Sequence, residues 1–71
     1  MMPVSMVKEG EANIIRKVVG KEDTRRFLET LGFVAGGTVT VISEMGGNII
    51  FNVQDSRVAI GKDMANKIMV S

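Results

Sequence analysis

The stretch that decides the fold is residues 24–42, which reads TRRFLETLGFVAGGTVTVI. Its first half carries apolar residues at helical spacing: Phe27, Leu28 and Leu31. This spacing predicts one apolar stripe of a short α-helix over about residues 21–31. Gly32 followed by the apolar Phe33 is typical of a helix end, because glycine takes the left-handed conformation that closes many helices. The first half of the stretch therefore predicts a helix with a defined exit.

The second half of the stretch changes to the periodicity of a strand. Gly36 and Gly37 favour a turn, and the β-branched run from Thr38 to Val41 alternates between the two faces of a strand. A second apolar run follows at residues 49–53. The two runs predict an antiparallel hairpin at the centre of the fold.

Parity predicts the turn between these two strands. Side chains alternate on both strands, so Val41 and Phe51 share the core face only if the turn contains an odd number of residues. We therefore expect a three-residue turn, Met45-Gly46-Gly47, with Gly47 in the left-handed conformation.

The flanking segments predict further short strands. Residues 1–7 are apolar and contain Pro3, which cannot donate a ladder hydrogen bond and so belongs at the start or the edge of a sheet. In residues 12–19 the apolar residues come in doublets, which predicts either a bulged strand or a strand covered on both faces. The C-terminal part predicts a short strand at 57–60, a single helical turn at 62–67 and a last strand at 68–70.

Together these elements predict a mainly β fold. About five or six short strands and one inserted helix are too few for two stacked sheets, so we expect a small, curled partial barrel that also hides its strand edges. Residues 1–71 should form a single domain near the lower size limit for folding alone. The predicted core is Leu28, Leu31, Val39, Val41, Phe51, Val53, Val58 and Ile60.

The composition argues against catalysis, metal binding and cofactor binding. The chain has no cysteine and no histidine, so it lacks the usual base of nucleophilic catalysis and the commonest ligands of zinc and iron. Its acidic residues show no calcium-site spacing, and its six methionines are spread along the chain as packing residues often are. We expect no enzyme, no cofactor and no metal site.

The composition also argues against nucleic-acid binding and membrane insertion. The net charge is only +1, and without Trp or Tyr and with three Phe the chain has few stacking platforms. A small RNA-binding barrel is therefore disfavoured. No run approaches the length of a membrane span, and the N-terminus does not resemble a secretory signal, so we expect a cytoplasmic protein.

Three segments resemble the ferrous iron transport protein A (FeoA) family. The run LGFVAGGTVTV is similar to the family's leucine-glycine-phenylalanine, turn and alternating-valine signature. EGEANIIRKVVG resembles its opening glycine and first long strand, and RVAIGKDMANKIMV resembles its closing strand, alanine-bearing turn and final strand. Two positions depart from the pattern: Ala35 stands where the family usually has proline, and Phe27 where it often has arginine.

The resemblance implies an SH3-like β-barrel in a small bacterial cytosolic protein. It also implies a partner, the membrane iron transporter FeoB, which such proteins regulate or assemble from its cytoplasmic side. A related domain forms the C-terminal end of iron- and manganese-dependent repressors. The alternative is therefore a detached regulatory module of that kind, although this chain lacks the helix-turn-helix and the metal ligands of a repressor.

The partner surface is predicted from the face of the hairpin that points away from the core. That face carries Ile42 and Ile50, two apolar residues in an unusual position for a soluble barrel. Nearby apolar residues could extend it, which gives the predicted partner-binding set: Phe33, Ile42, Met45, Ile50 and Met69. We expect this set to receive an apolar segment of the transporter or, in weak self-association, another copy of the domain. The open alternative is that the helix or the N-terminal strand covers it.

Overall fold

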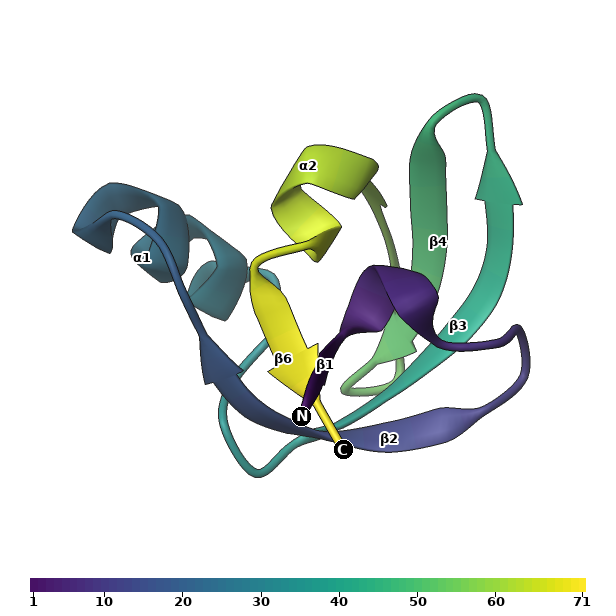
Figure 1. Ribbon diagram of the computed structural model, residues 1–71, viewed down its shortest axis with the longest axis horizontal. Helices are drawn as coiled ribbons and strands as arrows, with labels where there is room; N and C mark the ends of the chain where they lie inside the picture. Colours follow the sequence, from purple (N-terminus) through teal and green to yellow (C-terminus); the bar gives the residue numbers. More distant parts are fainter.

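Six antiparallel strands form one curled sheet in the computed structural model, which describes all of residues 1–71 (Figure 1). Along the sheet the strands follow the order β1-β6-β2-β3-β4-β5. Their bounds are β1 Met2–Pro3, β2 Ala12–Val18, β3 Thr38–Met45, β4 Asn48–Val53, β5 Ser56–Gly61 and β6 Ile68–Val70. The helices are α1 Glu22–Thr30 and α2 Lys62–Ala65, with one 3₁₀ turn at Val4–Met6. The predicted mainly β barrel with one inserted helix is confirmed.

Strand β2 is the corner at which the sheet bends. Its first residues, Ala12 to Ile14, pair with β3, whereas its later residues, Ile15 to Val18, pair with β6. The register with β6 shifts between Ile15 and Lys17, so Arg16 is the extra residue of a bulge. This confirms the bulged-strand interpretation of the apolar doublets. A bulge increases local twist, which helps one strand to serve both halves of a curled sheet.

The core is a single cluster of 13 buried apolar residues. At its centre the rings of Phe33 and Phe51 meet edge to face, with their centroids 5.5 Å apart. Six of the eight predicted core residues are buried, while Leu31 and Val58 are partly exposed and pack against the cluster. The remaining buried residues are Val4, Ile15, Phe33, Ile49, Ala65, Ile68 and Val70.

The predicted three-residue turn between β3 and β4 is wrong. Met45 pairs with Asn48, so the turn contains only Gly46 and Gly47, both with positive φ (55° and 85°). An even turn keeps Val41 and Phe51 on one face because β3 carries a bulge: the register shifts between Val41 and Ser43, and Ile42 is the extra residue. The core face is as predicted, but a bulge within the strand supplies the odd residue that we expected in the turn.

Helix α1 ends as predicted but begins without a side-chain cap. Gly32 has a φ of 108°, and the amide of Phe33 donates to the carbonyl of Leu28, the hydrogen bond of a Schellman closure. At the other end Lys21 occupies the N-cap position with no side-chain hydrogen bond. Asp23, a good capping residue type, instead lies within the first turn, where its charge favours the helix dipole.

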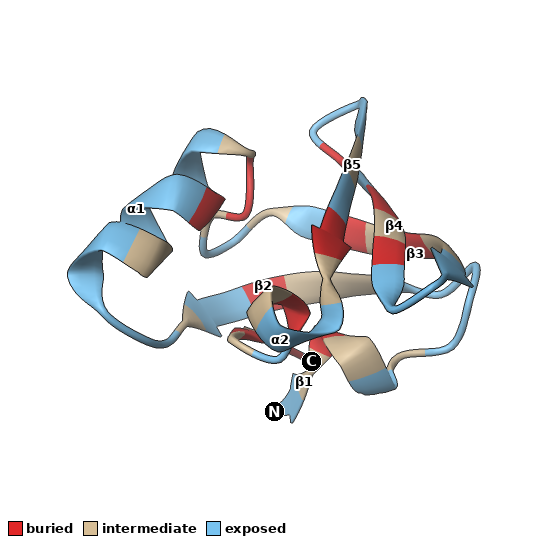
Figure 2. Cartoon of the chain, turned by 90° about the horizontal axis from the view of Figure 1, so that it is seen from above, coloured by how far each residue is buried: buried red, intermediate tan, exposed pale blue.

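Helix α1 projects from one end of the barrel (Figures 1 and 2). Leu28 is its only buried residue. Phe27, which the helical spacing placed on the inward stripe, is 50% exposed, so that expectation is wrong. Adjacent side chains on a helix point about 100° apart. Because α1 contacts the barrel only near its C-terminal end, it buries Leu28 and leaves the neighbouring Phe27 exposed.

Candidate interaction surface

The sequence predicts a partner surface on the outer face of the β3–β4 hairpin, and in the structure β5 extends this face. On β4, Ile49, Phe51 and Val53 are buried, so Ile50 and Asn52 point away from the core. On β3, Val41 and Glu44 flank the bulge on the core side, so both Ile42 and Ser43 lie on the outer side next to Ile50.

Four apolar residues gather at one end of this face. Ile50 pairs with Ser43 on β3 and with Ala59 on β5, and Met45 lies two residues beyond Ser43 on the same side. Met45 is 66% exposed and Ala59 is exposed, while Ile42 and Ile50 are partly exposed. We call Ile42, Met45, Ile50 and Ala59 the apolar outer patch.

The other end of the same face is polar. Thr40, Asn52 and Arg57 form the next cross-strand row after the apolar outer patch. A shallow groove of about 260 Å³ follows, and it is lined by Thr38, Thr40, Asn52, Gln54 and Asp55. Its walls carry hydroxyl, amide and carboxylate groups but no apolar side chain. The outer face therefore has an apolar end at the β3–β4 turn and a polar end at the β4–β5 turn.

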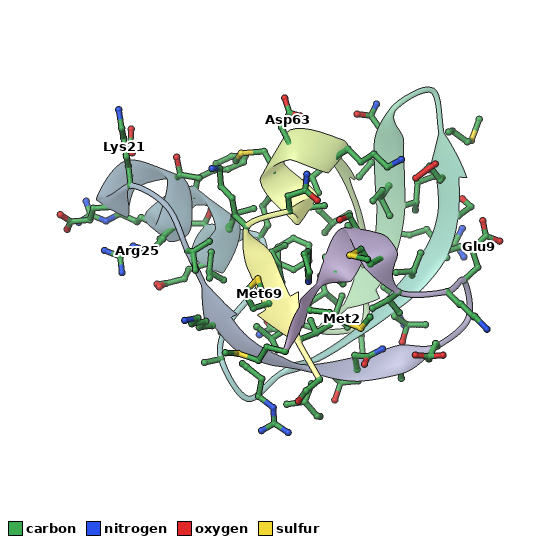
Figure 3. The ribbon with its side chains drawn as sticks, in the orientation of Figure 1. Met2, Glu9, Lys21, Arg25, Asp63 and Met69 are labelled. Atoms are coloured by element: carbon green, nitrogen blue, oxygen red, sulfur yellow. The ribbon has the colours of Figure 1, made fainter.

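Two of the five predicted partner-binding residues lie elsewhere. Phe33 is fully buried against Phe51, so its prediction as a surface residue is wrong: it closes α1 from the inside. Met69 lies on β6, where it pairs with Pro3 of β1 and Lys17 of β2 (Figure 3). Met69 therefore lies beside Lys17, near the end of β2. Strand β3 pairs only with the start of β2, through Thr38 to Thr40, and Ile42 lies further along β3, past the end of that pairing. Met69 and the apolar outer patch are therefore separate.

Ala59 is the member of the apolar outer patch that the sequence prediction missed. The signal was present, because placing Val58 and Ile60 inward leaves Ala59 outward on the same strand. What was missing was the register: only the pairing of β4 with β5 shows that Ala59 lies directly opposite Ile50.

The charged groups of the chain form no metal-binding cluster. No three His, Cys, Asp or Glu side chains are grouped so that they could hold an ion. The two ion pairs are at the surface: Arg26 with Glu22 on α1 at 2.7 Å, and Lys62 with Glu44 at 3.2 Å. At the start of α1 the charged side chains of Lys21, in the N-cap position, and of Arg25 point away from the barrel (Figure 3). Neither helix has the length and apolar character needed to cross a bilayer.

The curled six-stranded sheet with one projecting helix defines a small SH3-like domain. The FeoA domain family model matches residues 2–71. The Fe(2+) transport protein A assigned in Methanocaldococcus jannaschii is 34% identical over 70 residues, which are 99% of this chain and 85% of that protein. This chain therefore belongs to the FeoA family, and the predicted family is confirmed.

Solved structures of the family share the fold. The crystal structure of an iron uptake regulatory protein (FeoA) superposes with a TM-score of 0.91 at 34% identity, covering 99% of this chain and 93% of that one. FeoA of Stenotrophomonas maltophilia in complex with zinc, described as an SH3 domain protein and a candidate activating factor of ferrous iron transport, gives a TM-score of 0.87 at 22% identity. It covers 100% of this chain and 91% of that one.

The fold is also found within a repressor. A manganese-dependent transcriptional repressor gives a TM-score of 0.90 at 15% identity, covering 99% of this chain and 40% of that one. At this identity the likeness shows the fold alone. It agrees with the expected structural relation between this domain and part of such repressors.

Proposed function

We propose that this protein is a cytoplasmic, non-catalytic accessory protein of ferrous iron uptake. It acts by direct contact with a FeoB-type membrane transporter, on the cytoplasmic side, and either regulates or assembles it. Membership of a ferrous iron transport family supports the process. A partner-binding mode is supported by the side chains themselves, because none forms a metal cluster and the pockets are shallow and polar.

The apolar outer patch carries the proposal. Ile42 and Ile50 are adjacent, partly exposed and extended by Met45 at the β3–β4 turn. Isolated exposed apolar residues are ordinary on protein surfaces, but a contiguous group is typical of an interaction site. Methionine suits such a site because its flexible side chain repacks around the apolar groups of a partner. The occupant is an apolar segment of the transporter.

Capture of the transporter from detergent-solubilised membranes of the source cell tests this function. The immobilised wild-type chain should retain a FeoB-type transporter, identified by mass spectrometry, and Ile50→Glu should abolish retention because it places a charge in the apolar contact. Asn52→Glu is the matched control, since Asn52 lies on the same face of the same strand and is exposed. It should leave retention unchanged.

The outcomes of this experiment distinguish a wrong binding surface from a wrong function. If both variants fold by circular dichroism and Ile50→Glu still retains the transporter, the partner uses another face. If Ile50→Glu does not fold, Met45→Glu replaces it, because Met45 is 66% exposed and tolerates a charge. Wild-type chain that retains no transporter would contradict the proposed function itself.

The alternative is a detached regulatory module related to metal-dependent repressors. The observation in its favour is the shared fold, at a TM-score of 0.90. On that alternative the wild-type chain would capture a DNA-binding protein rather than a membrane transporter. The same mass spectrometry experiment, run on the soluble fraction, distinguishes the two.

A further inference from the structure

The two edges of the sheet differ in how they are protected. Strand β1 has only two residues, and one of them is Pro3, which has no amide hydrogen to offer a neighbouring strand. Short edge strands and proline are two of the usual ways in which proteins prevent unwanted strand pairing. Strand β5, at the opposite edge, has six residues, no proline and an uninterrupted register with β4.

Strand β5 presents unpaired backbone groups to solvent. The turn before it has two residues, Gln54 and Asp55, both with positive φ (49° and 61°), so Val53 and Ser56 form the closing hydrogen-bonded pair. In an antiparallel ladder the hydrogen-bonded pairs alternate, so Val58 and Ile60 also bond to β4 while Arg57 and Ala59 direct their N–H and C=O groups away from it.

No other part of the chain uses these groups. Arg57 and Ala59 form no backbone hydrogen bond outside the strand ladders, and β5 pairs with no strand except β4. Both residues are exposed. Strand β5 is the last strand in the sheet order, and β4 is its only neighbour. The edge is therefore a template for one further antiparallel strand.

We propose that two copies of this chain associate through their β5 strands, antiparallel and with Ala59 opposite Ala59 of the second copy. This register satisfies the outward N–H and C=O groups of both copies, because each residue of the outward-bonding set, Arg57, Ala59 and Gly61, faces another residue of that set. It places Arg57 opposite Gly61 of the second copy, so no like charges meet and the long side chain lies opposite a residue without one.

The same register joins the apolar surfaces of the two copies. The two-fold axis of an antiparallel pair runs perpendicular to the sheet, so both outer faces lie on one side. The row formed by Ile50 and Ala59 then continues into Ala59 and Ile50 of the second copy. On the inner face the partly exposed Val58 lies opposite Ile60 of the second copy. A second copy therefore satisfies the hydrogen-bonding groups of this edge, brings no like charges together and continues the apolar surface.

This inference does not rest on the proposed function. It concerns the backbone edge of β5, whereas transporter binding is tested at Ile50 and Met45. A chain that dimerises and captures no transporter would contradict only the proposed function. A chain that captures the transporter as a monomer would contradict only the inference.

Amide exchange and sedimentation on the full chain test the inference. Hydrogen exchange of the Arg57 and Ala59 amides should be fast in dilute protein and slow by at least about tenfold in concentrated protein, while the Val58 amide, already bonded to β4, changes little. Sedimentation over the micromolar-to-millimolar range expected for a small interface should show a monomer–dimer equilibrium.

A proline at Ala59 provides the decisive variant. Ala59→Pro removes only an outward N–H, so β4 pairing is retained, and the variant should fold and remain monomeric. Ala59→Thr keeps the N–H and is the matched control, which should dimerise as the wild type does. Two results would overturn the inference: wild-type amides at 57 and 59 that exchange equally fast at all concentrations, or a dimer that persists in folded Ala59→Pro. If Ala59→Pro does not fold, the wild-type exchange data decide alone.

Discussion

The β3–β4 hairpin and helix α1 are consecutive in the sequence, but they are held in the fold in different ways. The hairpin buries five side chains, Val39, Val41, Ile49, Phe51 and Val53, and pairs with strands on both of its sides. Helix α1 buries one side chain, Leu28, and is fixed to the barrel at its C-terminal end by the closure that runs through Gly32 to Phe33. The hairpin therefore contributes five residues to the core, whereas the helix contributes one and depends on that anchor.

The difference shows which parts of a small domain leave room for function. A strand buried on one face still presents every second side chain to solvent in a fixed position, so the hairpin can be both core and binding surface. A helix with one buried residue is positioned less firmly, since local stability follows the number of buried contacts. This is why we assign the partner surface to the hairpin and not to the half-exposed Phe27 on α1.

The largest effect should follow from removing the central ring of the hairpin. Phe51 is fully buried and packs edge to face on Phe33. Phe51→Ala should cost about 3–5 kcal/mol, most of the stability of a domain of this size. Chemical denaturation measures it. A cooperative unfolding transition close to that of the wild type would show that the core does not depend on this ring.

Adjacent positions on α1 should give a second, smaller contrast. Leu28 is fully buried and Phe27 is 50% exposed. Leu28→Ala should cost about 2–5 kcal/mol, whereas Phe27→Ala should cost less than about 1 kcal/mol despite removing a larger side chain. Denaturation midpoints of the two variants are compared directly. Equal costs would mean that α1 rests on the barrel through both residues.

The closure of α1 should contribute a smaller amount than its anchor. Gly32 has a φ of 108°, and a Cβ there would meet only the Gln54 side chain at 3.5 Å, so strain and not a clash opposes a substitution. Gly32→Ala should cost about 1–2 kcal/mol. Gly61→Ala is the control, because Gly61 has a φ of −66° that alanine adopts freely, and it should stay within about 0.5 kcal/mol.

Much of the structure of the hairpin and of α1 could be predicted from the sequence, and each wrong prediction has a specific physical cause. The helix, its glycine closure and the inward faces of the strands follow from periodicity and residue type, which are local signals. The two-residue turn was missed because a bulge at Ile42 and an even turn produce the same parity as no bulge and an odd turn. Sequence alternation cannot distinguish these two arrangements.

The site was predicted less completely than the fold. Strand parity, which is local, predicts that Ile42 and Ile50 share a face, but Met45 joins Ile42 on that face only because of the bulge at Ile42. The positions of Phe33 and Met69 depend on which distant segments meet them. Phe27 was misplaced for a related reason. Helical spacing defines a stripe, but only the angle at which α1 meets the barrel decides which part of the stripe is covered.

The smallest expected effect concerns iron itself. No cluster of His, Cys, Asp or Glu is present on either the hairpin or the helix, so neither region should bind ferrous ion specifically. Anaerobic calorimetry with ferrous ion should show only weak binding that disappears with added salt, because exposed carboxylates alone are screened. Micromolar affinity at a defined stoichiometry would refute this and would require a ligand set that the folded chain does not show.

The central claim is that the hairpin face, and not α1, receives the transporter. Calorimetric titration of the transporter's purified cytoplasmic part with wild type, Ile50→Glu and Phe27→Glu tests it most directly, since both variants place one new carboxylate at an apolar position. We expect Ile50→Glu to weaken binding by at least about tenfold and Phe27→Glu to change it by less than about twofold. A large loss in Phe27→Glu together with unchanged binding in Ile50→Glu would contradict the account and assign the interaction to the helix.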